Sequence, residues 1–170
     1  GPAKIAKLTF REIAEDSTAF LELKTGGVDL LLGVPADLLG EVQKEANLAV
    51  LTKPGMDVWY MPINVTKAPF DDIRVREAAA KAINQEEILG SVFGGVGSVA
   101  DTFLISALPE SHVSDSAKIH YDPARANALL DEAGWVMGAD GVRAKDGQPL
   151  KVSLWTQSDS IFRRLTEVVQ

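Results

Sequence analysis

The first 65 residues alternate between strand-like apolar runs and helix signals, and this alternation constrains the fold more than any other feature. The strand-like runs cover residues 5–10, 28–32, 47–51 and 58–65. Between the first two runs, Asp16 or Ser17 can cap a helix that ends at the glycines after Thr25. Pro35 is placed to be the first residue of a second helix. Strands that alternate with helices in this way favour an α/β fold.

Two further helices are predicted in succession after residue 70. Asp71 or Asp72 can cap the first, and apolar residues then recur at helical spacing from Val75 onward. Asn84, with Glu87 three residues later, has the pattern of a capping box at the start of the second. Because the helix dipole favours negative charge near an N-terminus, these acidic residues have a structural role without any acid–base chemistry.

A later helix carries its own start and stop signals. Asp122 can cap it, Pro123 suits its first position, and Gly134 can end it. Periodicity and composition predict four more segments: an irregular stretch at 98–119, a hairpin or loop at 138–147, a strand at 150–155 and a helix at 160–170.

Charge and cysteine content exclude several classes of protein. The chain has 17 basic and 24 acidic residues and a net charge of −7, whereas nucleic-acid and anionic-lipid surfaces need clustered positive charge. It has no cysteine, which excludes disulfide scaffolds, thiolate zinc sites and cysteine nucleophiles. No apolar run approaches the roughly 20 residues that a membrane-spanning helix needs. We therefore expect no nucleic-acid partner.

Residues suited to catalysis or metal binding are scarce. The two histidines, His112 and His120, both lie in the irregular stretch, where solvated imidazoles are expected rather than zinc ligands. No G-x-S-x-G motif occurs, and the glycines at 94–97 lack the lysine of a phosphate-binding loop and follow a helix. The sequence thus predicts that the chain is not an enzyme and holds no metal or cofactor.

Aromatic and basic residues offer the remaining binding candidates. Trp59 and Tyr60 are adjacent in a predicted strand, so their rings face opposite sides, and either a core role or stacking on a ligand fits them. Arg74 and Arg76 are two apart on a predicted helix and therefore point to different faces. We interpret one of the two arginines as pairing locally with an acid.

Four segments, in order and spacing, resemble the family-5 extracytoplasmic solute-binding proteins, the peptide/nickel/oligopeptide group that serves ABC importers. Residues 64–78 with 82–84 resemble the family's N-x-x-x-x-P-[FL]-x-D-x-R-V-R-x-A signature and the A-[IV]-[DN] that follows it. Residues 121–135 are similar to its Y-D-P-x-x-A-x-x-L-L-x-E-A-G-[WY] pattern. Residues 25–30 and 140–150 are similar to two shorter family patterns, and the four together cover nearly the whole chain.

The resemblance implies both a fold and a function. The implied fold is α/β, of the periplasmic-binding-protein-like type II, with two lobes whose mixed sheets are flanked by helices. Residues 99–102, together with Gly134, Trp135 and Arg143, are most similar to the nickel-type branch. The implied function is that of a solute-binding component of an ABC importer. It would capture a peptide or metal chelate between the lobes and deliver it to the membrane permease, in the periplasm or at the cell surface.

Two alternatives stay open at this point. One is a sensory, chemoreceptor-coupled binding protein of the same fold. The other is a truncated interaction module without ligand binding. In either case, exposed apolar surface would let the chain form a dimer.

The resemblance also implies how the chain is divided, because full-length members are longer. We expect a middle fragment, in which Gly1-Pro2 is the scar of a removed tag. Residues 3–62 would be part of a first lobe ending in a hinge strand at 58–65, and residues 63–170 part of a second, helix-rich lobe. The implied ligand-binding residues near the cleft are Trp59, Tyr60 and Asn64.

Overall fold

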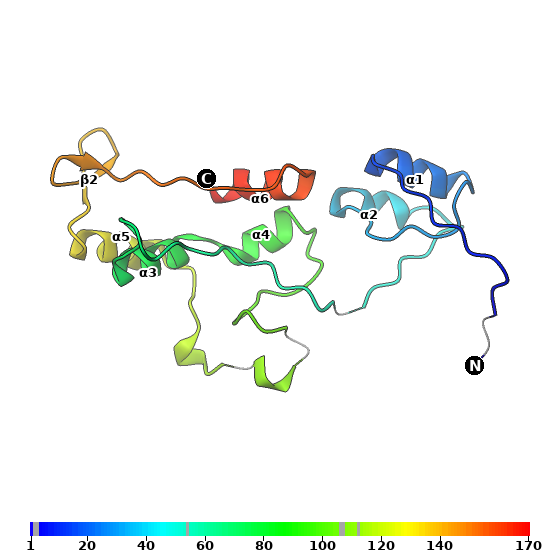
Figure 1. Ribbon diagram of the computed structural model, residues 1–170, viewed down its shortest axis with the longest axis horizontal. Coiled ribbons are helices and arrows are strands. Elements are labelled where there is room, and N and C mark those ends of the chain that lie inside the picture. The colour runs from blue at the N-terminus through cyan, green and yellow to red at the C-terminus, as the bar shows by residue number, and fades with distance from the viewer. Residues whose placement is uncertain (2–3, 54, 106–107, 112) are drawn as a thin grey trace. The chain divides into compact units, whose positions relative to one another are not determined.

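The computed structural model describes residues 1, 4–53, 55–105, 108–111 and 113–170 (Figure 1). His112, one of the two histidines considered above, lies outside the described residues. The chain divides into two compact units, Gly1–Thr52 and Lys53–Gln170.

The first unit contains two short helices, α1 (Asp16–Lys24) and α2 (Ala36–Val42). The side chains of Ala19 and Phe20 in α1 are buried, and Val42 at the end of α2 is only 2% exposed. The two predicted helices of this region are therefore confirmed, and each buries part of its apolar face.

Both helices begin differently from the prediction. Glu15 is the N-cap of α1 and makes no side-chain cap hydrogen bond, so Asp16 and Ser17 lie inside the helix and do not cap it. The Glu15 carbonyl accepts a hydrogen bond from the backbone N–H of Ala19 at 2.9 Å, which starts the helix one residue earlier. Pro35 has ψ 143°, which is not helical, and is the N-cap of α2 instead of its first residue.

The second unit contains the remaining helices and the only sheet among the described residues. Its elements are α3 (Ile73–Ala82), α4 (Gln85–Ser91), α5 (Pro123–Glu132), α6 (Ser160–Val169) and the 3-10 turns η1 (Pro109–Ser111) and η2 (Asp115–Ala117). The four predicted helices are confirmed. Apart from the two 3-10 turns, the described part of 98–119 has no regular structure, as its weak periodicity indicated.

Side-chain caps define the starts of these helices. The cap of α3 is Asp72 and not Asp71, and its side chain accepts a hydrogen bond from a backbone N–H of the first turn. Asn84 does the same for α4 and Asp122 for α5, each at the predicted position. A cap of this kind is worth about 1 kcal/mol, because it pairs a backbone donor that the helix leaves unsatisfied.

The core of the second unit lies between α3 and α5. Ala78 of α3 packs with Ala126 and Leu129 of α5, and Leu130 adds a partly buried side chain. The small alanines allow the two helices to approach closely. At the start of α5, the backbone N–H of Asp122 donates to a carbonyl at the end of α3, at 2.9 Å.

A three-stranded antiparallel sheet follows α5, in the order β1 (Val136–Met137), β2 (Arg143–Lys145), β3 (Gln148–Pro149). Asp146 and Gly147 connect β2 to β3 with φ of 52° and 76°. Two residues with positive φ are the requirement of a type I′ hairpin, which Asp-Gly meets readily. The predicted hairpin is confirmed.

Five predicted strands are absent from the described chain, at 5–10, 28–32, 47–51, 58–65 and 150–155. The α/β content consists of helices and the small antiparallel sheet, and no mixed sheet is formed among the described residues. The physical reason is that a segment with the composition of a strand forms one only where a second segment pairs with its backbone N–H and C=O groups. Figure 1 shows residues after β3 running on as an open trace.

Candidate functional site

Trp59 is held between two phenylalanine rings in the second unit. Its ring centroid lies 5.4 Å from that of Phe93, in an edge-on arrangement, and 4.6 Å from that of Phe162. Phe93 follows α4 and Phe162 belongs to α6, so the cluster joins three segments far apart in sequence. Aromatic pairs at such distances add about 0.5–1.5 kcal/mol beyond the area that they bury.

The other two predicted site residues lie in different surroundings. Tyr60 is 74% exposed, and its ring contacts no other ring among the described residues. The Asn64 side-chain oxygen accepts hydrogen bonds from the backbone N–H of Thr66 at 3.0 Å and from its hydroxyl at 2.8 Å. Of the three residues, Trp59 contacts two rings while 44% exposed, Tyr60 is largely exposed, and Asn64 shapes a turn.

The signature segment forms a local ion pair at the start of α3, and the same arginine reaches the end of α5. The Asp72 carboxylate accepts hydrogen bonds from the Arg74 side chain at 2.5 and 3.0 Å. These bonds, followed by one from the Arg74 backbone N–H, lower the pKa of Asp72 to about 2. Arg74 also donates to the carbonyl of Glu132, the last residue of α5, at 2.6 Å. The predicted local pairing of one arginine with an acid is confirmed.

Two basic residues of the hairpin bind the same, C-terminal end of α5. Lys145 donates to the carbonyl of Ala133 at 2.8 Å. The side chain of Arg143, 8% exposed, donates to the Trp135 carbonyl and the Asp131 carboxylate, both at 2.5 Å, and to the Asn127 amide oxygen at 2.9 Å. Positive charge at a helix C-terminus is favoured by the dipole, and here it also satisfies unpaired carbonyls.

The sequence reasoning did not find this role of Arg143. The only hint of this role in the sequence was that Arg143 lies in residues 140–150, the last of the four segments that resemble the family. A buried arginine in a hairpin cannot be assigned to a helix end until the hairpin is folded back on that helix.

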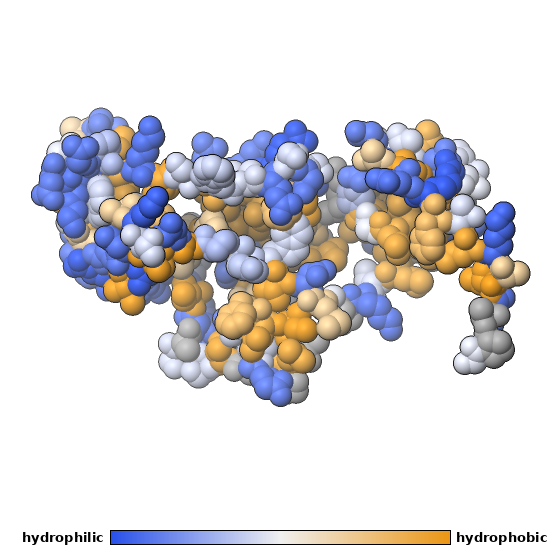
Figure 2. All heavy atoms as spheres, in the orientation of Figure 1, coloured by the Kyte–Doolittle hydropathy of each residue, from blue (hydrophilic) through white to orange (hydrophobic). Residues whose placement is uncertain are grey.

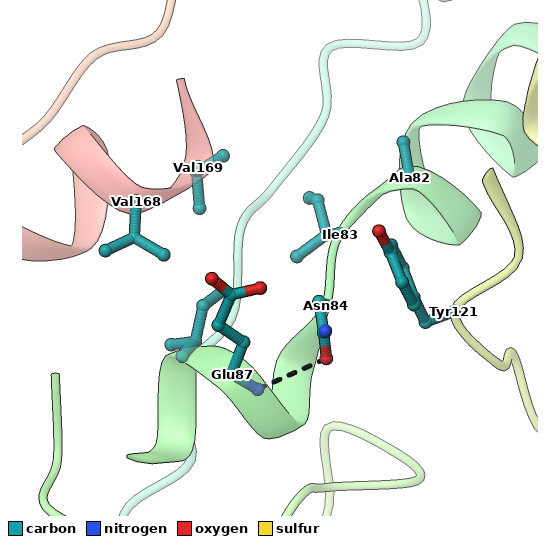
Figure 3. Close-up of a pocket in the computed structure, with 8 residues that line it drawn as sticks. Ala82, Ile83, Asn84, Glu87, Tyr121, Val168 and Val169 are labelled. Carbon is teal, nitrogen blue, oxygen red and sulfur yellow. Dashed lines mark hydrogen bonds between the residues drawn. The ribbon is translucent and has the colours of Figure 1, made fainter. Parts of the chain in front are cut away.

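Two adjoining cavities lie around the first turn of α4. The smaller, about 210 Å³, is lined by α4, the C-terminal turn of α6 and the residues between α3 and α4 (Figure 3). The larger, about 550 Å³, is also lined by Tyr121 and reaches His120 and the loop at 98–101. Both include Asn84 and Ile83 in their walls.

The charged groups of the larger cavity are largely matched. The Lys118 ammonium lies 3.1 Å from the Asp115 carboxylate and 3.3 Å from that of Asp101. Hydrogen bonds to Asp115 and then Asp101 raise the pKa of Lys118 above its ordinary value. Within the described residues, no three histidine or acidic side chains come together in a group that could hold a metal ion. None of the helices described is long and apolar enough to cross a membrane.

Comparison with known proteins relates this chain to one family. Residues 1–170 match the family profile described as "Bacterial extracellular solute-binding proteins, family 5 Middle". The nickel-binding periplasmic protein of Escherichia coli (strain K12) is 32% identical over 173 residues, covering 98% of this chain and 33% of that protein. The glutathione-binding protein GsiB of Pectobacterium atrosepticum is 33% identical over 141 residues, covering 81% of this chain and 26% of that protein.

Solved structures show the same relationship. NikA from Brucella suis, in complex with Fe(III)-EDTA, superposes with a TM-score of 0.78 at 28% identity, over 93% of this chain and 33% of that one. AppA from Bacillus subtilis, an oligopeptide-binding protein in complex with a nonapeptide, gives a TM-score of 0.72 at 27% identity, over 93% and 32%. The expected α/β, periplasmic-binding-protein-like fold class is thereby confirmed.

The chain spans about a third or less of the length of these relatives. The profile match nevertheless extends over every residue, and it includes Asp72 and Asp122, which cap α3 and α5, and Arg74, which donates to the end of α5. The chain belongs to the bacterial extracellular solute-binding proteins of family 5.

Proposed function

We propose that these residues are the middle section of the solute-binding component of an ABC importer. The observation that carries the proposal is the profile match over residues 1–170, to the section of this family described as middle. The relatives' names add support, because they refer to binding of nickel and glutathione and to a periplasmic location. The whole protein would be exported to the periplasm or the cell surface and would act with a permease in the membrane.

The surface of the chain supports a place inside a larger protein. Its accessible surface is 13062 Å². Two separate compact units of these sizes would expose only about 9,600 Å². Large apolar side chains contribute to the excess, including Leu51 at 90% and Trp155 at 89% exposed. Figure 2 shows apolar residues at the surface of both compact units. Surface of this kind is normally covered, here by the remaining parts of the protein or by a second copy in a dimer.

The proposed mechanism is capture by closure of two lobes around the solute. A solute that contacts both lobes binds the closed state more tightly than the open one, and so shifts the population toward closure. The class of solute proposed is a peptide or a metal chelate. No covalent step is needed, so binding alone accounts for the function.

Within this mechanism, we keep Trp59, Tyr60 and Asn64 as residues near the cleft. The ring of Tyr60, the more exposed of the two, would be available for stacking on a solute, while the contacts of Trp59 with two phenylalanines would hold the neighbouring backbone in place. We propose that residues 3–62 are part of the first lobe and residues 63–170 part of the second. The boundary between the compact units, after Thr52, falls ahead of the proposed hinge segment at 58–65.

The test is thermal unfolding of the full-length protein with dipeptides, longer peptides, glutathione, and nickel with and without histidine. A solute at one hundred times its Kd stabilises a protein by about 2.7 kcal/mol, which gives a clear rise in Tm. A rise with peptides alone would assign a peptide importer, and a rise only with chelated nickel would assign a nickel importer. If no solute raises Tm, the transport function is wrong. The 170-residue chain alone is the control, and we expect no shift because the second half of the clamp is absent.

A further inference from the structure

Residues 150–158 form an extended segment whose backbone is left without a partner. The backbone N–H of Leu150 donates to the Arg143 carbonyl at 2.6 Å, which is the last backbone hydrogen bond to the hairpin. From residue 151 to residue 158, no backbone N–H or C=O is hydrogen-bonded to another backbone group of the described chain. Such a row of unpaired groups is what a neighbouring strand needs in order to pair.

The side chains of this segment have the pattern of a strand, and its apolar face is uncovered. Leu150, Val152 and Leu154 alternate with the polar residues Lys151 and Ser153, so the apolar side chains share one face. Val152 is 54% exposed and Leu154 is 43% exposed. The apolar face of a strand is normally buried against other elements, so the segment lacks a cover as well as a partner.

Helix α6 follows after a short loop and turns back toward the segment (Figure 1). The Thr156 hydroxyl donates to the Phe162 carbonyl at 3.3 Å, which joins the end of the segment to the first turn of the helix. Ile161, Leu165 and Val168 recur at helical spacing and form an apolar stripe. No residue of α6 is buried, and Val168 is 41% exposed. The stripe is therefore only partly covered.

An extended segment followed by an amphipathic helix that turns back makes up the first two parts of a β-α-β unit. The third part of such a unit is a strand parallel to the first, and the helix packs on both strands. Parallel strands need a connection of about a dozen residues or more, which residues 156–170 provide. Residues 150–155 would span about 20 Å, and the ten residues of α6 span about 15 Å, so the helix can return along the strand.

The full-length protein has further chain that can supply the missing strand. The chain spans about a third of the length of its relatives, and the profile that it matches is described as the middle section. We propose that the residues directly after Gln170 in the full-length protein form a strand that pairs in parallel with residues 150–155. The crossover through α6 is right-handed, and the helix covers both strands. This inference rests on the proposed place of the chain as a middle section, and on no solute.

The test is a disulfide scan in the full-length protein. Val152→Cys is combined in turn with a cysteine at each of about twelve positions after Gln170, and the 170 residues described here contribute no other thiol. Paired strands lie about 5 Å apart, within reach of a disulfide. We expect cross-links at alternate positions only, because successive side chains point to opposite faces. Lys151→Cys is the matched control, and its cross-links should fall on the positions in between.

Hydrogen exchange of the unaltered proteins is an independent measurement that needs no variant to fold. The peptide of residues 150–157 should exchange at least about tenfold more slowly in the full-length protein than in the 170-residue chain, because strand hydrogen bonds protect its amides. Neither experiment contains a solute. A failed solute titration would therefore count against the transport function without affecting this inference.

Four results would overturn the proposal. They are equally fast exchange in the two proteins, cross-links that are absent or show no alternation, cross-links to residues 58–65 in place of the residues after Gln170, and cross-linked dimers as the only product. The last result would make a second copy of the chain the partner of this segment.

Discussion

Replacing Arg143 by alanine is expected to separate the hairpin from α5. The side chain is 8% exposed and donates to the Trp135 carbonyl, the Asp131 carboxylate and the Asn127 amide oxygen. Asp131 is 57% exposed and can regain water, so it contributes little to the cost. The other two acceptors lose their partner in a partly buried setting, at about 1–2 kcal/mol each. We therefore expect Arg143→Ala to lower the free energy of unfolding of this unit by roughly 2–4 kcal/mol.

For a unit of this size, such a loss lowers Tm by about 10 °C. Thermal unfolding followed by near-UV circular dichroism measures the shift. Hydrogen exchange then locates it, and protection should be lost first in β1 and β2. Arg143→Lys should fall in between, because an ammonium group cannot satisfy three acceptors that a planar guanidinium reaches together.

Arg125→Ala is the matched control for this experiment. Arg125 lies on α5 and, like Arg143, pairs with a carboxylate, that of Glu132 at 2.6 Å, but it is exposed at 44%. Its removal should leave Tm almost unchanged. If Arg125→Ala lowers Tm as much as Arg143→Ala does, burial of the guanidinium is not what stabilises the hairpin, and the reasoning is refuted.

Three further predictions concern other parts of the second unit. Because the pKa of Asp72 is lowered from 3.8 to about 2, its ion pair stabilises the fold above pH 3.8 and is lost as the pH falls toward 2. The Tm of Asp72→Asn should therefore lie below wild type at pH 7 and converge with it near pH 2; a constant difference would contradict this. Phe162→Ala should increase hydrogen exchange throughout α6, because the ring contact of Phe162 with Trp59 holds this helix. The control Phe103→Ala, at a 79% exposed position, should leave the hydrogen exchange of α6 unchanged. In the full-length protein, Tyr60→Ala should weaken solute binding about tenfold, as measured by calorimetry. Its Tm should be unchanged, because a 74% exposed ring contributes little to stability. An unchanged affinity would remove Tyr60 from the proposed site.

Local features of the chain could be predicted from sequence. The caps Asn84 and Asp122 and the stop at Gly134 were each placed correctly, because a cap is decided within a few residues of itself. The failures among caps were also local. Glu15 starts α1 with its backbone alone, which leaves no signal in the side chain.

Strands could not be predicted in the same way. Residues 58–65 and 150–155 have the composition and alternation of strands, yet the described chain pairs neither of them. Alternation reports which faces a segment can bury, but the hydrogen bonds that make it a strand come from another segment. The hairpin at β2 and β3 succeeded because its partner is two residues away.

By itself, the sequence determined the family, the charge balance and the helices, since these depend on residue type and short spacing. Only the tertiary structure placed Arg143 on the end of α5 and Trp59 against Phe93 and Phe162. Each of these arrangements joins residues far apart in the chain. Which distant residues meet depends on how helices pack against one another, and no local pattern records it.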